Sequence, residues 1–475
     1  MSRVEYYENA GLQERLKDVA SLSARSKLTS APQKLVVVLV GMPARGKSVI
    51  SSKLYSFLRW TGLSVRSFNV GQYRRMSATE SDGRISNAHA SFFADTDESN
   101  AAFREALAMH ALDDLLAWLD GGGEVGLFDA TNSTRKRREA ILGKCRAWSG
   151  ARSRGGRPAL QVVFVESLCD DRVVLEANMR NKVMSSPDFR GMSFDAALED
   201  LRERIAVYER RYETVGDDEG SYVKLFNFSS KVTAHLCFGK LSRTLVPYLM
   251  AIHSDDRPVY LTALAPQGEE PEYDQGGESD DSSLDAEFAT RLSEWWWGQH
   301  RSSCALSQSD RGQSRLQILT STLAPAINAA TTIQNVRPDL VKVLHTSALN
   351  PLLLGPHQRE SISAHIGTHF EDDDALPANR AFKDRSDGGE SYADLVSRLE
   401  ACILDIEASV DPILIITHAT PARALRAYFQ NIDLSQSLMG HPHSPPAKAL
   451  ANRQPAVLEQ RAKLGGGWEE QVHVF

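Results

Sequence analysis

The residues with the clearest chemical potential form a glycine-rich loop directly after an apolar run. Residues 35–40 are all apolar and include four valines, and Gly41, Gly46, Lys47 and Ser48 follow at the spacing G-x-x-x-x-G-K-[ST]. The backbone N–H groups of such a loop, at the start of a helix, cradle a polyphosphate while the lysine reaches the outer phosphates. A serine hydroxyl is an oxygen ligand of the kind that Mg²⁺ takes. We therefore predict a nucleoside triphosphate site with Mg²⁺ as its metal.

A second candidate for the chemistry is the carboxylate of Asp129, at the end of an expected strand. Asp129 follows the apolar residues 125–128, at the carboxyl end of an expected central strand. Ligands of open α/β sheets bind at these strand ends. A carboxylate there can orient the metal or accept the proton of an attacking hydroxyl. The alternative role, capping the next helix, falls better to Asn132 or Ser133, so we predict that Asp129 is catalytic.

Arginines are the second sign of an anionic acceptor. Arginine binds phosphate bidentately and stays charged, so a cluster of arginines suits a phosphorylated sugar. Arg204 and Tyr208 are four residues apart and share one helical face. An ordinary solvated face of a charged helix is the alternative interpretation of that segment. The arginines in question are Arg74, Arg75, Arg104, Arg137, Arg138 and Arg204.

Composition excludes several classes of protein. A chain of 475 residues is too long for one ordinary core, which predicts two domains. The excess of 61 acidic over 54 basic residues gives a net charge of −7, so we expect no nucleic-acid or membrane partner. Five scattered cysteines without a C-x-x-C pair indicate reduced thiols and no zinc site. With no visible secretory signal, we expect a cytoplasmic protein.

Strand and helix patterns alternate from Lys34 onward, which predicts a parallel sheet covered by helices. We expect a variable leader over 1–33, a first domain over 34–255, a second over 256–433 and a tail over 434–475, with a solvated acidic loop at 267–283. Expected strands lie at 35–40, 64–70, 124–130, 160–165, 259–262 and 413–417, and expected helices at 48–61, 101–119, 133–148, 194–212, 241–252, 288–297 and 391–409.

Several segments, taken in order, closely resemble the 6-phosphofructo-2-kinase/fructose-2,6-bisphosphatase family. They are GMPARGKS, FNVGQYRR, FDATNSTRKRR, VESLCDD, SSPDF and RIAVYERRY. The likeness runs from about residue 34 to 250 and more weakly from 257 to about 430. It implies a P-loop kinase domain, mainly a parallel sheet with helices on both faces, followed by a second α/β domain of the histidine-phosphatase, phosphoglycerate-mutase-like type. It also implies ATP- and Mg²⁺-dependent phosphorylation of the 2-hydroxyl of fructose 6-phosphate.

The resemblance assigns roles position by position. Lys47, Asp129 and Cys169 are implied to be active-site residues, and Ser48 and Asp129 to hold the metal. Cys169 fits a small buried packing role better, because phosphoryl transfer of this type needs no thiol nucleophile. The nucleotide contacts implied are Gly41, Met42, Pro43, Ala44, Arg45, Gly46, Lys47, Ser48, Val49, Asn178 and Lys182. The sugar-phosphate contacts implied are Arg74, Arg104, Thr131, Arg137, Arg204 and Tyr208.

The sequence departs from the family at one lysine of the kinase half. The family has a lysine just before its S-S-P-D stretch that touches both ATP and the sugar phosphate. Val183 occupies that aligned position here, and the lysine, Lys182, comes one residue earlier. Lys182 is therefore the candidate for this cation.

The second half has the family's outline without its chemistry. Phosphatase activity needs an Arg-His-Gly triplet after the first strand, and Ala263, Leu264 and Ala265 align with it. A further phosphate-binding arginine aligns with Pro325 and an acidic residue with Thr346, so only His418 remains. Leucine has no lone pair to attack phosphorus, so we predict that this activity is lost. The domain is then expected to be a regulatory, anchoring or dimerising module, the last giving a homodimer.

Two other functions stay open at this point. One is a catalytically silent scaffold of the same fold that senses nucleotide and sugar phosphate. The other is a P-loop kinase for another small phosphorylated metabolite. A kinase for nucleic-acid ends is disfavoured because the chain is acidic and lacks a basic stripe with interleaved aromatic residues.

Overall fold

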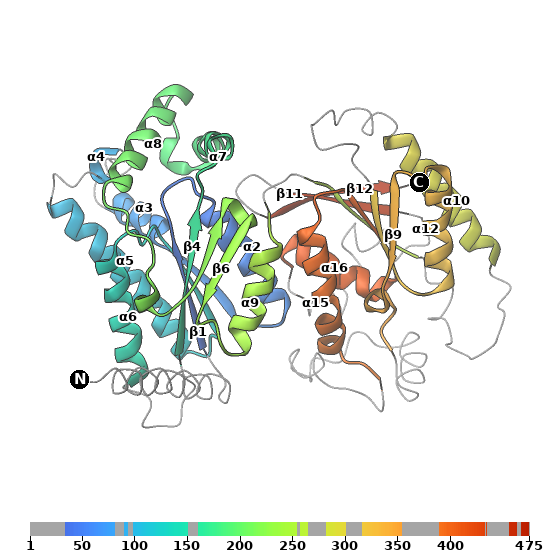
Figure 1. Ribbon diagram of the computed structural model, residues 1–475, viewed down its shortest axis with the longest axis horizontal. Helices are drawn as coiled ribbons and strands as arrows, with labels where there is room; N and C mark the ends of the chain where they lie inside the picture. The colour runs from blue at the N-terminus through green and yellow to red at the C-terminus, as the bar shows by residue number, and fades with distance from the viewer. Residues whose placement is uncertain are drawn as a thin grey trace, which may run out of the picture. The chain divides into compact units, whose positions relative to one another are not determined.

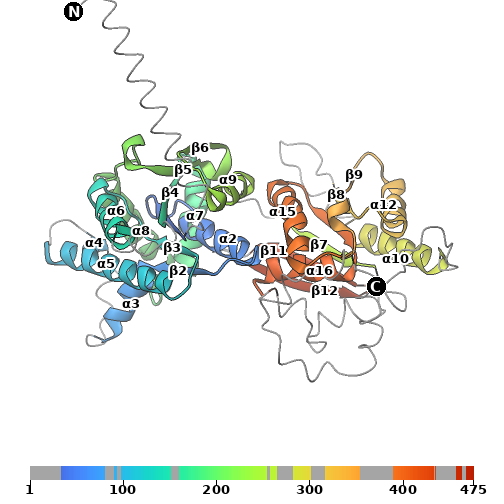
Figure 2. The same cartoon turned by 90° about the horizontal axis from the view of Figure 1, so that it is seen from below.

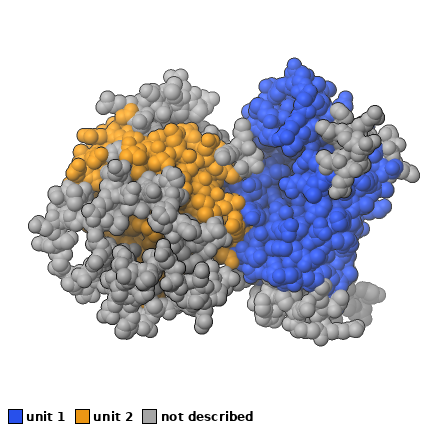
Figure 3. All heavy atoms as spheres, turned by 180° about the vertical axis from the view of Figure 1, so that it is seen from behind, with its two compact units in different colours: residues 1–55, 63–252 blue, residues 56–62, 253–475 orange. Residues whose placement is uncertain are grey.

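The computed structural model divides the chain into two compact units, one of residues 1–55 and 63–252 and the other of residues 56–62 and 253–475 (Figure 3). The division after Ile252 lies near the expected boundary at 255. The leader over 1–33 and most of the acidic loop, residues 267–281, lie outside the described residues. The structure describes residues 34–80, 90–93, 98–150, 160–253, 257–264, 282–300, 316–353, 389–432, 434, 456–462 and 467–474.

The first unit is built on a six-stranded sheet with the order β2-β3-β1-β4-β5-β6. All neighbouring pairs are parallel except β5 and β6. The expected α/β class with a mainly parallel sheet is therefore confirmed for this unit. The strands are β1 (Lys34–Val40), β2 (Val65–Asn69), β3 (Val125–Asp129), β4 (Leu160–Leu168), β5 (Ser221–Phe226) and β6 (Lys231–His235).

Helices cover both faces of this sheet (Figure 1). Helices α5 and α6 lie on one face, and α2 and α9 on the other. The helical segments are α2 (Lys47–Trp60), α3 (Val70–Glu80), α4 (Ala90–Phe93), α5 (Glu98–Asp120), α6 (Arg135–Gly150), α7 (Arg172–Ser185), η3 (Pro187–Phe189), α8 (Phe194–Glu209), η4 (Asp217–Glu219), η5 (Asn227–Ser229) and α9 (Lys240–Ala251).

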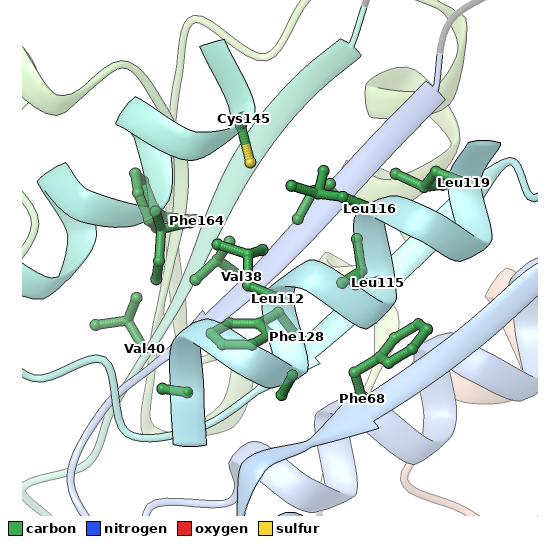
Figure 4. Close-up of a cluster of buried hydrophobic side chains, with 14 of the residues drawn as sticks. Val38, Val40, Phe68, Leu112, Leu115, Leu116, Leu119, Phe128, Cys145 and Phe164 are labelled. Carbon is green, nitrogen blue, oxygen red and sulfur yellow. The ribbon is translucent and has the colours of Figure 1, made fainter. Parts of the chain in front are cut away.

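Strand β1 is central because it is apolar on both faces. Val36, Val38 and Val40 belong to a core cluster with Leu112 and Leu115 of α5. Figure 4 shows Val38, Val40 and these two leucines. A fully buried valine or leucine contributes about 1.5–3 kcal/mol relative to an exposed one. Such a strand is stable only between two helical layers. This places its carboxyl end, and the loop that follows it, at the middle of the sheet edge.

The cap of α6 differs from our expectation. Asn132 adopts a left-handed φ of 44°, and its amide donates to the Leu39 carbonyl at 2.7 Å, so it is engaged elsewhere. The helix begins at Arg135, and the Thr134 hydroxyl accepts the Arg137 N–H at 3.3 Å. Capping by Asn132 or Ser133 was therefore wrong, because the Asn132 amide bonds a carbonyl of strand β1 and Thr134 caps the helix.

The second unit contains another six-stranded sheet, with the order β12-β11-β7-β10-β8-β9. Strands β7, β10, β8 and β9 run parallel to one another, while β11 is antiparallel to both β7 and β12. Helix α16 contacts β7 and β12 (Figure 2). The elements are β7 (Val259–Ala263), α10 (Ser282–His300), β8 (Leu316–Thr320), α12 (Ala324–Val336), β9 (Val341–His345), η6 (Ser347–Leu349), α15 (Tyr392–Ala408), β10 (Ile413–Thr417), α16 (Ala419–Gln430), β11 (Ala456–Ala462) and β12 (Trp468–Val474).

The expected tail over 434–475 is corrected by this sheet. Residues 456–462 form β11, which pairs with β7, and residues 468–474 form β12. Val457 and Leu458 are fully buried. The surrounding prolines and glycines concealed two short strands, and the partner strand β7 lies about 200 residues earlier, too far for any local pattern to reveal. In the described part of the chain, no helix is both long and apolar enough to cross a membrane.

Candidate active site

The glycine-rich loop connects β1 to α2 in a conformation that requires its glycines. Gly41 and Gly46 have φ values of +144° and +83°, and Ala44 between them has +57°. A Cβ on Gly41 would lie 2.7 Å from the Ser167 carbonyl oxygen, and one on Gly46 would lie 2.6 Å from the Phe228 ring. The backbone thus passes where any side chain would collide. The loop opens directly into the first turn of α2, the arrangement that presents N–H groups to an anion.

Lys47 and Asp129 form the charged centre of this sheet edge. The Lys47 ammonium donates to the Met42 carbonyl at 2.5 Å, which folds it across the loop. The Asp129 carboxylate accepts the Asn69 amide at 2.7 Å and the Ser48 hydroxyl. Both charged side chains are buried, with exposed fractions of 8% and 6%. Charges buried this deeply interact strongly with one another and with any ligand that displaces water.

Burial shifts both groups toward their neutral forms. Burial, with a smaller contribution from the neighbouring Lys182, lowers the pKa of Lys47 to about 7, and Asp129 opposes the shift. Burial also raises the pKa of Asp129 despite the opposing effects of Lys47 and Lys182. Perturbed groups of opposite sign in one buried cluster are typical of functional sites.

Lys182, and not Val183, faces this centre. Val183 is buried in an apolar cluster with Phe189 and Leu201. The charge of Lys182 interacts with those of Asp129 and Asp188. Burial lowers the pKa of Lys182, and these two carboxylates oppose that shift. The lysine that comes one residue early in the sequence therefore still lies within electrostatic reach of Asp129.

A second cluster gathers the arginines of α3 and α8. Arg74 and Arg204 both donate to one oxygen of Asp188, at 2.6 and 3.2 Å. Arg204 also donates to Asp200 at 2.7 Å. The Phe93 ring lies beneath both guanidinium groups, 5.4 Å from Arg74 and 4.8 Å from Arg204. The alternative interpretation, that this charged helix only presents a solvated face, is wrong at Arg204, because this residue is only 5% exposed.

Arg104 and Arg137 form a third group beside these two. Arg104 donates to the Phe92 carbonyl and lies 5.7 Å from that ring. Arg137 is 2.6 Å from Glu105 and reaches the Arg104 carbonyl at 3.5 Å. The Phe92 and Phe93 rings touch edge to face, with their centres 5.3 Å apart. Arg104 and Arg137 therefore lie beside the Arg74–Arg204 cluster. The next arginine, Arg138, is fully buried and binds Glu219, which gives it a structural role.

The remaining candidates are spread around the loop. The Thr131 carbonyl accepts the Gly41 N–H at 3.0 Å and ties β3 to the phosphate loop. Tyr208 is buried with its ring 6.2 Å from Phe93. Among the described residues the buried amide nitrogen of Asn178 has no hydrogen-bond partner, which leaves a donor for a ligand. Burial raises the pKa of the Cys169 thiol, which opposes formation of a nucleophilic thiolate.

Sequence reasoning missed four side chains that organise the site. Asn69 holds Asp129, Phe93 lies beneath two arginines, Glu105 holds Arg137, and Asp188 joins Arg74 to Arg204. Asp188 lies in the SSPDF segment, so its motif was visible although its contacts were not. Nothing in the spacing of the other three indicated which side chain each would contact.

The second unit presents a different picture at the ends of β7 and β10. Leu264 is buried, and its N–H donates to the Thr417 carbonyl at 2.9 Å. Pro325 lies in the first turn of α12, and the Thr346 hydroxyl caps η6. The Nε2 atom of His418 lies 2.9 Å from the Ser321 hydroxyl. None of these side chains is a cation that could hold phosphate.

His418 should make folding depend on pH. Burial lowers the pKa of His418 from 6.5 to about 4, so the folded chain holds a neutral imidazole where the unfolded chain takes up a proton. Stability should therefore fall as pH drops from about 6.5 to about 4, by at most about 1.4 kcal/mol per pH unit. We expect His418→Gln to remove this dependence. Denaturant unfolding at pH 7, 6 and 5 measures it, with the exposed His345→Gln as control. Equal pH slopes in wild type and His418→Gln would contradict this assignment.

Comparison with known proteins agrees with this arrangement. Residues 24–256 match the model of the 6-phosphofructo-2-kinase family, and residues 290–445 match the histidine phosphatase superfamily, branch 1. The chain is 34% identical over 411 residues to a 6-phosphofructo-2-kinase/fructose-2,6-bisphosphatase of Aquarana catesbeiana, an alignment that covers 86% of this chain and 79% of the relative. The chain belongs to this family. Almost all of the kinase match lies in the first unit, and the histidine-phosphatase match lies in the second.

Other members of the family differ in length and in name. The Arabidopsis thaliana protein called 6-phosphofructo-2-kinase/fructose-2,6-bisphosphatase is 32% identical over 411 residues, which are 85% of this chain and 50% of that protein. The Saccharomyces cerevisiae protein called 6-phosphofructo-2-kinase 1 is 32% identical over 414 residues, which are 84% of this chain and 48% of that protein. The chain therefore spans about half the length of these two relatives.

Proposed function

We propose that this protein is a 6-phosphofructo-2-kinase that transfers the γ-phosphoryl group of ATP to the 2-hydroxyl of fructose 6-phosphate. The observation that carries the proposal is that Ala44 of the phosphate loop packs in one apolar cluster with Phe189, whose ring contacts the Arg204 guanidinium. The phosphate loop therefore lies next to the arginine cluster, so donor and acceptor sites would adjoin. Direct in-line transfer needs that proximity.

The loop supports ATP as the phosphoryl donor. The glycines let the loop pack closely against Ser167 and Phe228 as it turns into α2, a turn that can present backbone N–H groups to phosphates. The Lys47 ammonium, now bonded to the Met42 carbonyl, could bind those phosphates instead. The unpaired Asn178 amide supplies a further donor. Burial makes the Lys47 charge costly without a partner, so a bound polyphosphate would relieve that cost.

The residues at the loop also fit Mg²⁺. The Ser48 hydroxyl and the Asp129 carboxylate touch each other, which provides two adjacent oxygen ligands. Among the described residues no three carboxylate, histidine or cysteine side chains converge on one point. Mg²⁺ commonly binds through one or two protein oxygens, with water and phosphate completing its shell. When bound, the ion would neutralise charge on the β- and γ-phosphates.

The chain's own residues would then position the acceptor and move its proton. Arg74 and Arg204, with Arg104 and Arg137 beside them, would hold the 6-phosphate end of the sugar. That grip would direct the 2-hydroxyl toward Asp129, whose carboxylate would accept the hydroxyl proton as the oxygen attacks phosphorus. The raised pKa of Asp129 makes it a better proton acceptor than an ordinary aspartate.

We further propose that the second domain has lost fructose-2,6-bisphosphatase activity. Leu264 occupies the position of the histidine nucleophile and cannot form a phosphoenzyme. Ala263 and Pro325 occupy positions where the family has arginines that bind phosphate. His418 remains, but its imidazole is buried and hydrogen-bonded to Ser321. Removing the nucleophile alone cost one well-studied protease about a millionfold in turnover.

Two assays on one preparation of the full chain test these proposals. We expect fructose 2,6-bisphosphate to form from ATP and fructose 6-phosphate in the presence of Mg²⁺. We expect no inorganic phosphate to be released when fructose 2,6-bisphosphate is supplied instead. Absence of product in the first assay would overturn the kinase proposal. Steady release of phosphate in the second would overturn the loss of phosphatase activity.

Replacing Arg104 tests the sugar end of the site. Arg104→Leu should raise KM for fructose 6-phosphate about 10- to 100-fold, because one charge-assisted hydrogen bond to a phosphate is worth about 1.5–3 kcal/mol. The KM for ATP should change little. Steady-state kinetics with each substrate varied in turn gives both values. Arg146→Leu, on the exposed side of α6, is the control. A larger effect on ATP than on the sugar would show that Arg104 belongs to the nucleotide site.

A further inference from the structure

The SSPDF segment forms a short, stiff turn at the edge of the arginine cluster. Pro187, Asp188 and Phe189 make one turn of 3₁₀ helix, η3, with proline at its start. The Ser186 hydroxyl accepts the Asp188 N–H at 3.3 Å and caps the turn. Proline fixes its own φ, and the Ser186 hydroxyl gives the Asp188 N–H, at the start of the turn, a hydrogen-bond acceptor. The Asp188 side chain is therefore held from a rigid backbone.

The Asp188 carboxylate meets three guanidinium groups. One oxygen accepts Arg74 at 2.6 Å and Arg204 at 3.2 Å, and the other accepts Arg75 at 3.3 Å. The side chain is only 10% exposed. Burial alone would raise the pKa of Asp188, but these arginines outweigh it and hold that pKa below the ordinary value. The carboxylate therefore stays ionised at any working pH of the enzyme.

Two aromatic rings complete the hold on the same arginines. The Arg204 guanidinium lies over both the Phe93 and the Phe189 ring, 4.8 and 4.9 Å from their centres. Arg74 lies 5.4 Å from Phe93. Arg74 and Arg204 thus share one carboxylate oxygen and one ring. Arginine has a large rotamer entropy, and here that freedom is lost on folding and not on binding.

We propose that Asp188 is a positioning residue that fixes Arg74 and Arg204 as a preformed fork for the phosphate of the sugar substrate. This inference rests on the proposed function, because it names how the same site recognises the 6-phosphate. Asp188 does not contact the reacting atoms. It acts through the two arginines that do the binding.

Charge and positioning predict opposite results for the loss of this carboxylate. Asp188 has the same sign as the phosphate, so Asp188→Asn adds one unit of positive charge to the cluster. Coulomb attraction alone would then tighten binding of a sugar phosphate. Preorganisation predicts weaker binding, because both arginines lose the oxygen that they share. We expect positioning to win, since bidentate phosphate recognition depends on the geometry of the two guanidinium groups.

The experiment compares full-length wild type with Asp188→Asn, Asp188→Glu and the exposed control Asp195→Asn. Calorimetry measures the Kd for fructose 6-phosphate, and kinetics measures KM for each substrate and kcat. For Asp188→Asn we expect Kd and KM for the sugar phosphate to rise about 10-fold, the loss of one charge-assisted contact, with KM for ATP within about 2-fold. Asp188→Glu should recover part of the affinity because it restores the charge. Asp195→Asn should match wild type.

Each outcome decides the inference. Binding by Asp188→Asn that equals or exceeds that of wild type overturns the positioning role. If Asp188→Asn fails to fold, Ser186→Ala replaces it, because that change loosens the turn and keeps the carboxylate. Ser186→Ala should weaken sugar-phosphate binding about 3-fold, a fraction of one hydrogen bond, and unchanged binding overturns the role.

The inference and the proposed function can fail separately. A wild type that binds fructose 6-phosphate without phosphorylating it, together with weakened binding by Asp188→Asn, refutes the kinase activity and supports the positioning role. If the wild type forms product and Asp188→Asn binds fructose 6-phosphate with unchanged affinity, the kinase activity is supported and the positioning role is refuted. A wild type that neither binds nor reacts refutes both.

Discussion

Lys47→Met should lower kcat for phosphorylation of fructose 6-phosphate about a thousandfold. Lys47 is the cation of the phosphate loop, and its charge is buried where Coulomb interactions are strong. Removing one preorganised donor from such a site costs about 10²- to 10³-fold, and loss of a full positive charge lies at the upper end of that range. The KM for ATP should rise as well, because the lysine binds phosphates in both ground and transition states.

The same change should leave the fold intact. Methionine is close to lysine in length, so Lys47→Met opens no cavity, and Lys182 still offsets the charge of Asp129. The variant should therefore remain folded, with a melting temperature close to that of wild type. Lys136→Met, an exposed lysine on α6, is the matched control and should retain full activity. A Lys47→Met variant with near-normal turnover would show that the loop does not hold the reacting phosphates.

Asp129→Asn should produce a loss of similar size by a different route. Asparagine can keep the contacts with Asn69 and Ser48 but offers no negative charge to a metal and no base to a hydroxyl. Loss of a positioned general base costs about 10²- to 10⁴-fold. We therefore expect kcat to fall about a thousandfold and the concentration of Mg²⁺ that gives half-maximal activity to rise. Steady-state kinetics over a Mg²⁺ series measures both.

A surface carboxylate provides the control for Asp129. Asp113 on α5 is exposed and pairs with Lys144 at 2.5 Å. Asp113→Asn should behave as wild type in rate and in its need for Mg²⁺. If Asp129→Asn lost activity but kept the normal dependence on Mg²⁺, the carboxylate would act as the base alone and Ser48 would be left as the metal ligand from the protein. Unchanged activity would remove Asp129 from the mechanism.

The sequence was most informative where local chemistry decides the structure. The apolar run 35–40, two glycines and Lys47 predict a strand, a tight loop and a helix start, because few other arrangements accept that order. The placement of Asp129 at a strand end followed from the alternation of strands and helices. These elements lie in the first unit as expected.

The sequence was least informative where pairing is non-local. Strands β11 and β12 were expected to be a tail because β7, which joins β11 to the sheet, lies in a distant part of the chain. The role of Asp188 was invisible for the same reason, since its arginine partners lie 114 and 16 residues away. Spacing reveals which residues share a helix face or a loop. It cannot reveal which side chains from separate elements meet.

The Lys182 position shows how packing resolves an ambiguity of alignment. A shift by one residue along α7 turns a side chain by about 100°, which normally exchanges a buried position for an exposed one. Val183 takes the apolar position and Lys182 the charged one. Each side chain therefore lies in surroundings that suit its chemistry, although the alignment places the valine, and not the lysine, at the family's lysine position.

The most direct test follows the labelled γ-phosphate of ATP into product. Wild-type protein, Mg²⁺, fructose 6-phosphate and ATP labelled at the γ-position should yield a sugar bisphosphate whose label is released by mild acid, as expected for phosphate on the anomeric 2-hydroxyl. Label found only as inorganic phosphate, on an acid-stable position, or still on ATP would contradict the account.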